Sequence, residues 1–174
     1  GETRTVVPSE ALAAQAAVPG GEDGRLLVLS ESADPGWRAT IDGQPLASAV
    51  TVFEGESKDV SAYASVDRTP GYERTIFGRH LDFYNDRQFL LQGGKLEAIA
   101  KPDDAKLEFW RDRVLIELRS DWAVAGRHWP RGSLLVTGAA AYLKGGRDFT
   151  ALFTPTPTRS LDSYALTRGT VLVN

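Results

Sequence analysis

The stretch 110–138, WRDRVLIELRSDWAVAGRHWPRGSLLVTG, decides the fold of this chain. Charged and apolar residues alternate from 113 to 119, and this period of two predicts a β-strand with one buried face. Two turn signals follow, Ala-Gly-Arg at 125–127 and Pro-Arg-Gly at 130–132. A second apolar run begins at residue 133. The stretch therefore predicts a strand, a double turn and a second strand.

The two faces of the 113–119 strand are expected to differ. The buried face holds Val114, Ile116 and Leu118. The opposite face carries charged side chains and one leucine: Arg113, Leu115, Glu117 and Arg119. An antiparallel sheet commonly has one face in the core and one in solvent, so this second face is expected to be wet.

The same pattern recurs in weaker form along the chain. Asp42-Gly43 and Gly93-Gly94 predict tight hairpins, and residues 80–84 favour a strand. Residues 139–144 (AAAYLK) favour one or two helical turns ended by a glycine pair. Ser9 is expected to cap another short helix of about two turns. About a dozen short strands with little helix indicate an all-β fold.

Length and composition bound the class of protein. The chain has 174 residues, 42% hydrophobic and 25% charged, which fits one globular domain. A net charge of −3 argues against a nucleic-acid partner, and the sequence has no apolar run long enough for a membrane helix. The lack of Cys excludes disulfides and thiolate metal sites. The sequence begins without a signal-peptide pattern, and its compartment stays unknown.

Few residues offer catalytic chemistry. The G-x-S-x-G pattern of a nucleophile elbow is absent, and Ser133 stands at the start of an expected strand. His80 and His128 are expected at a surface or an interface rather than as general bases. Neither belongs to an H-x-x-x-H or H-E-x-x-H pattern, so no metal or other cofactor is expected. No catalytic, cofactor-binding or metal-binding residue is therefore assigned.

Two weaker patterns involve carboxylates and arginines. The carboxylates considered for a glycosidase pair are Glu54, Glu56, Asp59, Asp82, Asp86, Asp103 and Asp104. No spacing selects two of them, because separation in space defines such a pair. Arg111, Arg113 and Arg119 fit a carboxylate-binding rim beside an aromatic-rich strand, but solvated charges on an exposed face are the commoner interpretation.

Three tryptophans are candidate ligand contacts. Aromatic rings stack on sugars, and Trp37 and Trp122, with Trp129 beside them in the central stretch, are the residues considered for this role. A tryptophan in an alternating strand belongs to the core more often. Both interpretations stay open at this point.

Seven stretches, in order, resemble a known family. They are PLASAVTVFEGESKDVS (45–61), RTPGYERT (68–75), LDFYND (81–86), KPDDA (101–105), LIELRSDWAVAGRHWPRGSLL (115–135), GRDFTALFTPTPTRSL (146–161) and ALTRGTVLVN (165–174). Through them residues 44–174 resemble the propeller domain of bacterial prolyl oligopeptidase family serine peptidases.

This resemblance implies a seven-bladed propeller that caps an α/β-hydrolase domain and restricts entry to its active site. The triad lies in that hydrolase domain, so no catalytic residue maps onto this chain. At about 45 residues per blade, residues 44–174 give roughly three antiparallel blades. Closed propellers need at least about four blades. The implied partners are the hydrolase domain or the remaining blades, or further copies bound through open strand edges.

Residues 1–43 resemble a different family. The stretch DGRLLVLSESADPGWRATIDG (23–43) is similar to the C-terminal β-rich part of actinobacterial membrane glycosyltransferases. The sequence thus predicts two parts: a β-hairpin segment with a short helix at 1–43, and a partial β-propeller at 44–174. The expected function is a non-catalytic propeller segment of a serine peptidase. A carbohydrate-binding β domain of an envelope glycosyltransferase and an artificial chimera without function are the alternatives.

Overall fold

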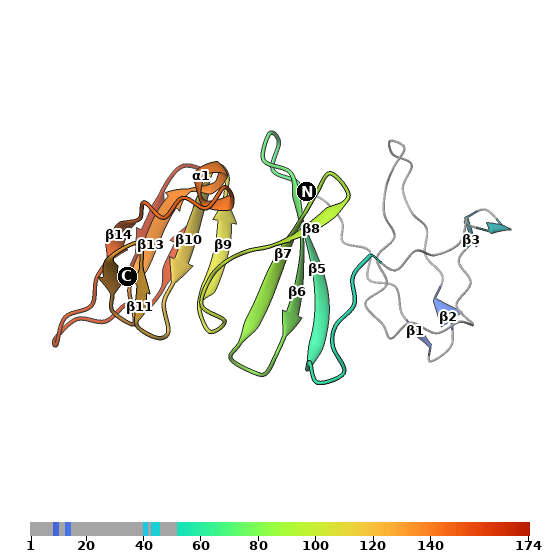
Figure 1. Ribbon diagram of the computed structural model, residues 1–174. Coiled ribbons are helices and arrows are strands. Elements are labelled where there is room, and N and C mark those ends of the chain that lie inside the picture. The colour runs from blue at the N-terminus through green and yellow to red at the C-terminus, as the bar shows by residue number, and fades with distance from the viewer. Residues whose placement is uncertain (1–8, 11–12, 15–39, 42, 46–51) are drawn as a thin grey trace.

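The computed structural model describes residues 9–10, 13–14, 40–41, 43–45 and 52–174. The described chain is nearly all β, with one short helix (Figure 1). Trp37 lies outside the described residues. No helix among the described residues has the length and hydropathy needed to cross a bilayer.

The first sheet is formed by four successive strands in the order β5-β6-β7-β8, all antiparallel. They are β5 (Ser61–Asp67), β6 (Arg74–His80), β7 (Asp86–Gln92) and β8 (Lys95–Ala98). The glycine turn expected at 93–94 joins β7 to β8, and Gly93 and Gly94 have φ of 55° and 76°. Positive φ at both central residues is the geometry of a type I′ hairpin turn, so this prediction is confirmed.

The second sheet has four strands in the order β9-β10-β13-β14. They are β9 (Lys106–Trp110), β10 (Arg113–Glu117), β13 (Leu134–Gly138) and β14 (Thr150–Phe153). The double turn predicted between β10 and β13 is a small hairpin, β11 (Trp122–Val124) with β12 (Arg127–Trp129). The expected helical turns form α1 (Ala139–Leu143), which lies beside β13 and β10.

The remaining strands form two-stranded ladders. A C-terminal hairpin joins β15 (Tyr164–Leu166) to β16 (Val171–Val173). Near the N-terminus, β3 (Thr40–Ile41) pairs with β4 (Gln44–Pro45) across the hairpin expected at 42–43, where Gly43 has φ of 75°. The described residues therefore form two four-stranded sheets and four two-stranded ladders, an all-β fold consistent with a partial propeller.

Two local expectations were wrong. Where a helix was predicted from Ser9, β1 (Ser9–Glu10) pairs with β2 (Ala13–Ala14). Isolated helices of two turns are marginal in water, so the local alanine propensity was a weak guide. A strand was also expected at 80–84, but β6 ends at His80. The Asp82 carboxylate accepts hydrogen bonds from the backbone of Tyr84 and Asn85, at 2.7 and 2.8 Å, and this closes a loop.

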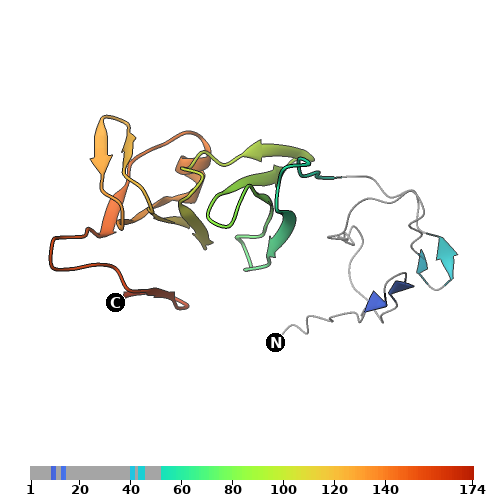
Figure 2. The same ribbon diagram turned by 90° about the horizontal axis from the view of Figure 1, so that it is seen from below.

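The core lies between the two four-stranded sheets, which stand side by side in Figures 1 and 2. Leu90 in the first sheet belongs to one buried cluster with Leu107, Val114 and Ile116 of the second. The cluster is completed by Ile99, Ala105, Leu118, Trp129, Leu135, Ala139, Tyr142 and Phe149. Sheets of contiguous sequence packed face to face are what a propeller predicts for neighbouring blades.

Strand β10 is buried on both faces, and the expected wet face was wrong at its centre. Leu115 has 0% exposure, the same as Val114 on the opposite face. Tyr164 of the C-terminal hairpin donates its hydroxyl to Glu108 at 3.0 Å, and Glu108 lies opposite Leu115 in the ladder. The hairpin therefore covers this face, and its distance along the sequence hid it from the strand's own pattern.

Candidate functional site

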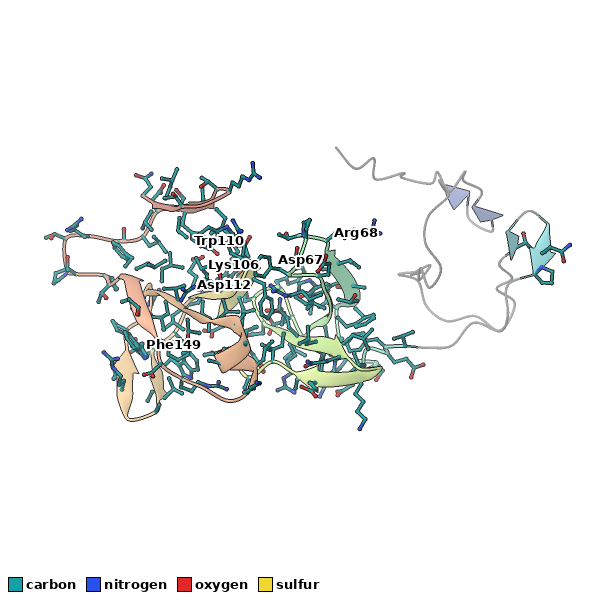
Figure 3. The ribbon with its side chains drawn as sticks, turned by 90° about the horizontal axis from the view of Figure 1, so that it is seen from above. Asp67, Arg68, Lys106, Trp110, Asp112 and Phe149 are labelled. Atoms are coloured by element: carbon teal, nitrogen blue, oxygen red, sulfur yellow. The ribbon has the colours of Figure 1, made fainter. Side chains whose placement is uncertain are left out.

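A groove of about 690 Å³ lies mainly between the first two sheets. Strands β5 and β9 form its two long sides, and each pairs with another strand on one edge only. Its lining is Tyr63, Ser65, Asp67, Thr69, Pro70, Tyr72, Ile76, Gln88, Leu107, Glu108, Phe109, Trp110, Arg111, Thr167 and Arg168. Figure 3 shows Asp67 and Trp110 from neighbouring sheets on this side of the molecule. The groove thus combines aromatic walls with free strand edges.

Three turns meet at one end of the groove, and Arg111 joins them. Arg111 sits in the β9–β10 turn with φ of 55°, a left-handed conformation that is uncommon for a residue with a side chain. Its guanidinium Nη1 donates to the carbonyl of Arg168 in the β15–β16 turn at 2.9 Å. Its Cζ lies 5.5 Å from the ring centre of Tyr72 in the β5–β6 turn. One side chain therefore contacts both neighbouring sheets.

Arg74 of strand β6 also contacts the β9–β10 turn. Its Nη2 donates to the carbonyl of Arg111 at 2.7 Å, and its guanidinium lies 4.5 Å from the ring centre of Phe109. Its Nη1 lies 3.5 Å from Oδ2 of Asp67 but makes no hydrogen bond. The carboxylate of Asp67 is thereby balanced by a cation on the side away from solvent.

At the floor of the groove, three partly buried polar side chains are joined by hydrogen bonds. Tyr63 donates its hydroxyl to Asp86 at 3.1 Å and accepts a hydrogen bond from the amide nitrogen of Gln88, also at 3.1 Å. Burial, with the nearby Asp86 charge, raises the pKa of Tyr63 to about 12. The other amide atom, Oε1 of Gln88, is buried without a hydrogen-bond partner. It is an unused acceptor at the floor of the groove.

Asp86 also belongs to a cluster of polar contacts with the loop between β8 and β9. Lys101, with a side chain only 1% exposed, donates from Nζ to Asp86 Oδ1 at 2.9 Å. The same ammonium donates to backbone carbonyls of Asp86, Pro102 and Asp103. Every donor of this buried cation has an acceptor, so the cluster has a structural role.

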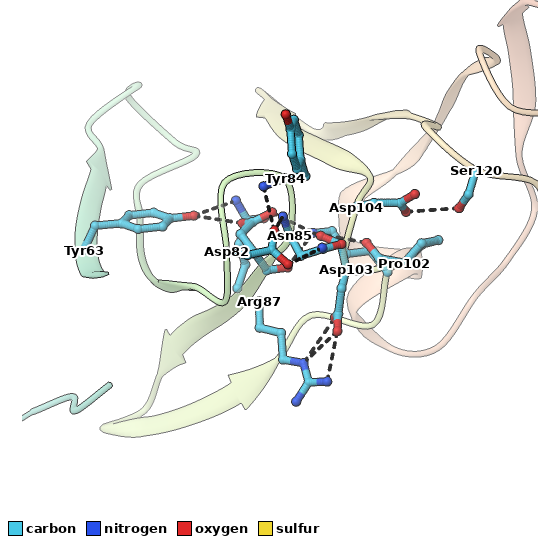
Figure 4. Close-up of polar contacts among 12 residues, drawn as sticks. Tyr63, Asp82, Tyr84, Asn85, Arg87, Pro102, Asp103, Asp104 and Ser120 are labelled. Carbon is cyan, nitrogen blue, oxygen red and sulfur yellow. Dashed lines mark hydrogen bonds and ion pairs between the residues drawn. The ribbon is translucent and has the colours of Figure 1, made fainter. Parts of the chain in front are cut away.

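Four of the other carboxylates considered earlier form local contacts. Asp59 and Glu56 both bind Arg79, at 2.6 and 2.8 Å. Asp103 binds Arg87 at 2.9 Å, and Asp104 accepts from the hydroxyl of Ser120 at 3.1 Å (Figure 4). No group of three or more potential metal ligands occurs within the part of the chain that the structure describes.

The tryptophans considered as ligand contacts lie in or beside the core. Trp129 is 7% exposed, and Trp122 is half-buried with its ring 5.3 Å from that of Phe149. Trp129 Nε1 is buried without a hydrogen-bond partner. These positions leave little indole surface for a sugar, and ligand contact by either residue stays a prediction.

The serine and histidines have separate environments. Ser133 is fully buried, and its hydroxyl donates to the carbonyl of Pro130 at 2.7 Å. His128 is exposed and lies 3.5 Å from Asp121. His80 stacks on Tyr63, with ring centres 4.9 Å apart. The hydroxyl of Ser133 is thus used to close the turn before β13.

Of the three arginines expected to form a carboxylate-binding rim, only one lines the groove. Arg111 lines the groove, whereas Arg113 lies at the surface with Nε 3.4 Å from Asp112, and Arg119 is exposed. Sequence reasoning missed Arg168 and Gln88. Arg168 occupies a turn equivalent to that of Arg111, a signal that aligning the three turns would have given. Gln88 stands inside a strand and carries no such signal.

No family model and no curated protein matches this sequence. Among solved structures, the chain is similar to a post-proline cleaving enzyme from Rickettsia typhi, with 25% identity and a TM-score of 0.63. The match covers 76% of this chain and 20% of that enzyme, so the chain spans about a fifth of the enzyme's length. The similarity supports a relation to the prolyl oligopeptidase family. None of the comparisons relates residues 1–43 to a glycosyltransferase, and the two-part origin stays a prediction.

Proposed function

We propose that this chain is a non-catalytic propeller segment of a prolyl oligopeptidase-type serine peptidase, the part that restricts substrate entry to a hydrolase domain. The observation that carries the proposal is the structural similarity to a post-proline cleaving enzyme. It is supported by two successive four-stranded antiparallel sheets, each built from contiguous sequence and packed on the next. In such a segment the sheets would surround part of the route by which a substrate reaches the hydrolase domain.

The proposed partners are further blades and the hydrolase domain. The far face of the first sheet supports this assignment, because it is apolar and only partly covered. Phe53 packs on Phe77 and Phe89, with ring centres 5.2 and 5.3 Å apart, while Val66 and Leu96 are 52% and 37% exposed. A neighbouring blade would bury these side chains. A further copy bound through an open strand edge is the other proposed partner.

The absence of catalysis by the chain alone is tested by activity-based labelling. The purified chain is treated with a fluorophosphonate probe and, separately, with a chromogenic peptide cleaved after proline. We expect neither labelling nor hydrolysis, with a complete post-proline cleaving enzyme as the positive control. Labelling that disappears in Ser133→Ala would contradict the proposal and identify the nucleophile.

The access role is tested by transplantation. Residues 52–174 replace the structurally matched segment of the Rickettsia typhi enzyme. The resulting protein is assayed with a short post-proline peptide and with an unfolded protein of more than about 100 residues, a size typical of one domain. We expect cleavage of the short peptide and exclusion of the long chain. Equal cleavage of both would show that these sheets do not restrict entry.

A further inference from the structure

The groove between β5 and β9 carries an imbalance of charge. Its two acidic side chains are already paired: Asp67 faces Arg74, while Glu108 accepts from Tyr164 and lies 3.7 Å from Lys106. The two basic side chains that line it are Arg111 and Arg168. Neither forms an ion pair with a carboxylate of the described chain. The uncompensated charge at this end of the groove is therefore positive.

We propose that the groove binds an extended peptide with its C-terminal carboxylate at Arg111 and Arg168. This inference goes beyond the proposed function, since it requires neither hydrolysis nor a further domain. Arginine is suited to this role, because its planar guanidinium donates two parallel hydrogen bonds to a carboxylate. Nη1 of Arg111 donates to the carbonyl of Arg168, and among the described residues neither guanidinium makes a further hydrogen bond.

The geometry of the end turn is consistent with a prepared site. The backbone of Arg111 is held at φ of 55° by the hydrogen bond from Arg74 and by its own contact with Arg168. Backbone in sparsely populated regions costs on the order of 1–3 kcal/mol and persists where the surroundings fix it. The guanidinium also lies over Tyr72, so its plane is fixed before any ligand arrives.

The rest of the groove suits a peptide more than a small anion. β5 and β9 each have one edge that pairs with no described strand, and such edges offer backbone donors and acceptors to an added strand. Gln88 lines the floor, and its Oε1 is buried without a hydrogen-bond partner, so a turn of this amide toward the groove would offer an acceptor to a peptide N–H. Phe109 and Trp110 provide apolar and aromatic surface for side chains. A phosphate ion would use only the arginine end.

The first experiment compares two forms of one peptide. The probe is N-acetyl-Val-Ala-Val-Ala-Phe with a free C-terminal carboxylate, and its control is the same peptide as the C-terminal amide. Binding to the full chain is followed by NMR at the indole N–H of Trp110 and the side-chain amide of Gln88. We expect the acid to shift both signals and to bind at least about tenfold more tightly than the amide, as loss of a charge-assisted hydrogen bond predicts.

Two variants locate the site. Arg168→Gln removes a guanidinium that makes no hydrogen bond or ion pair with a described residue, so the fold is expected to survive, and affinity for the acid should fall about tenfold. Gln88→Met removes the floor acceptor and should weaken acid and amide alike. Arg119→Gln, an exposed arginine outside the groove, is the matched control and should bind as the unaltered chain does.

Three results would overturn the proposal. The first is equal binding of acid and amide, because the carboxylate would then have no role. The second is no shift at Trp110 or Gln88 in the unaltered chain with about 1 mM peptide, a concentration at which even weak sites are occupied. The third is unchanged affinity in Arg168→Gln. Inorganic phosphate that binds as tightly as the acid peptide would replace the peptide site by a simple anion site.

Discussion

Gly78 shows how one residue can be fixed by its neighbour across a sheet. It pairs with Tyr63, and a Cβ at position 78 would lie 2.1 Å from Tyr63 Cζ. The tyrosine ring therefore covers the glycine, an arrangement known to rescue glycines within strands. Tyr63 cannot move away freely, because its hydroxyl is bound to Asp86 and Gln88. The absence of a side chain at 78 is a packing requirement.

Gly78→Ala is accordingly expected to lower the free energy of unfolding by about 2–3 kcal/mol, as overpacking does. Urea denaturation followed by tryptophan fluorescence measures the change. Gly138→Ala is the matched control: nothing lies within 4 Å of a Cβ there, and its φ of −68° suits alanine. If the free energy of unfolding falls no more in Gly78→Ala than in Gly138→Ala, the ring of Tyr63 moves aside at little cost.

The Asp59–Arg79 pair makes stability depend on acid. Both oxygens of Asp59 accept from Arg79, at 2.6 and 3.1 Å, and these hydrogen bonds lower the pKa of Asp59 below its ordinary value. A lowered pKa stabilises the fold above the unfolded value, near pH 4, and this contribution is lost as pH falls through the folded pKa. Thermal unfolding from pH 6 to pH 2 measures it.

Asp59→Asn should reduce the melting temperature at pH 6 and flatten the decline that the unaltered chain shows below about pH 4. Glu54→Gln, an exposed position outside this ion pair, is the control and should keep the slope. Parallel acid profiles for Asp59→Asn and the unaltered chain would mean that another carboxylate governs acid stability.

Among the charged side chains considered for substitution, loss of Lys101 is expected to lower the free energy of unfolding most. Its ammonium is buried and contacts Asp86 and three carbonyls, so Lys101→Met leaves a carboxylate without its cation. Removing one partner of a buried pair costs about 3–5 kcal/mol. Urea denaturation should show a loss in this range, against less than about 0.5 kcal/mol for Lys95→Met at an exposed position. A small loss in Lys101→Met would mean that water replaces the ammonium.

At the scale of elements, the C-terminal hairpin depends on contacts from strand β9 and its turn. Trp110 Nε1 donates to the carbonyl of Thr167 at 2.9 Å, and Arg111 donates to that of Arg168. Tyr164 also donates its hydroxyl to Glu108, and the ammonium of Lys106 lies 4.7 Å from the centre of its ring. Because few side chains hold it, this hairpin is expected to open before the two sheets do.

Arg111→Gly tests the docking of this hairpin. Glycine keeps the positive φ of the turn but loses the guanidinium contacts with Arg168 and Tyr72. Amide hydrogen exchange in β15 and β16 should become at least about fivefold faster, equivalent to about 1 kcal/mol, while exchange in β6 and β10 stays unchanged. Arg113→Ala, at an exposed strand position, is the control. Unchanged exchange in both would show that Trp110 and Tyr164 hold the hairpin alone.

The sequence predicted elements well where the signal was local. The turns at 93–94 and 125–126 follow from glycine chemistry, the strands of the 113–119 and 133–137 stretches from alternation and apolar runs, and α1 from its alanine run. The short strands β11 and β12 beside the turn at 125–126 were not predicted. It failed where another element decided the outcome. Leu115 was expected on a solvent-exposed face, because the residues near it in the sequence carry no sign of the C-terminal hairpin that covers it. Gln88 was invisible as a groove residue, since its role comes from the second sheet.

At the scale of the whole molecule, the buried core of the described residues comes from one part of the sequence. All described buried apolar residues lie between Phe77 and Phe149, and the first ring packed on that region is Phe53.

The division proposed near residue 43 therefore predicts that residues 44–174 fold without the rest. A chain that begins at residue 44 should unfold within about 3 °C of the full chain, because a loss of 1 kcal/mol would shift the midpoint by about 2–8 °C. Differential scanning calorimetry makes the comparison, and a chain that begins at residue 61, lacking Phe53 and Asp59, is the positive control and should melt clearly lower. A large fall already at residue 44 would show that the N-terminal part stabilises the sheets, and the division into two parts would have to be abandoned.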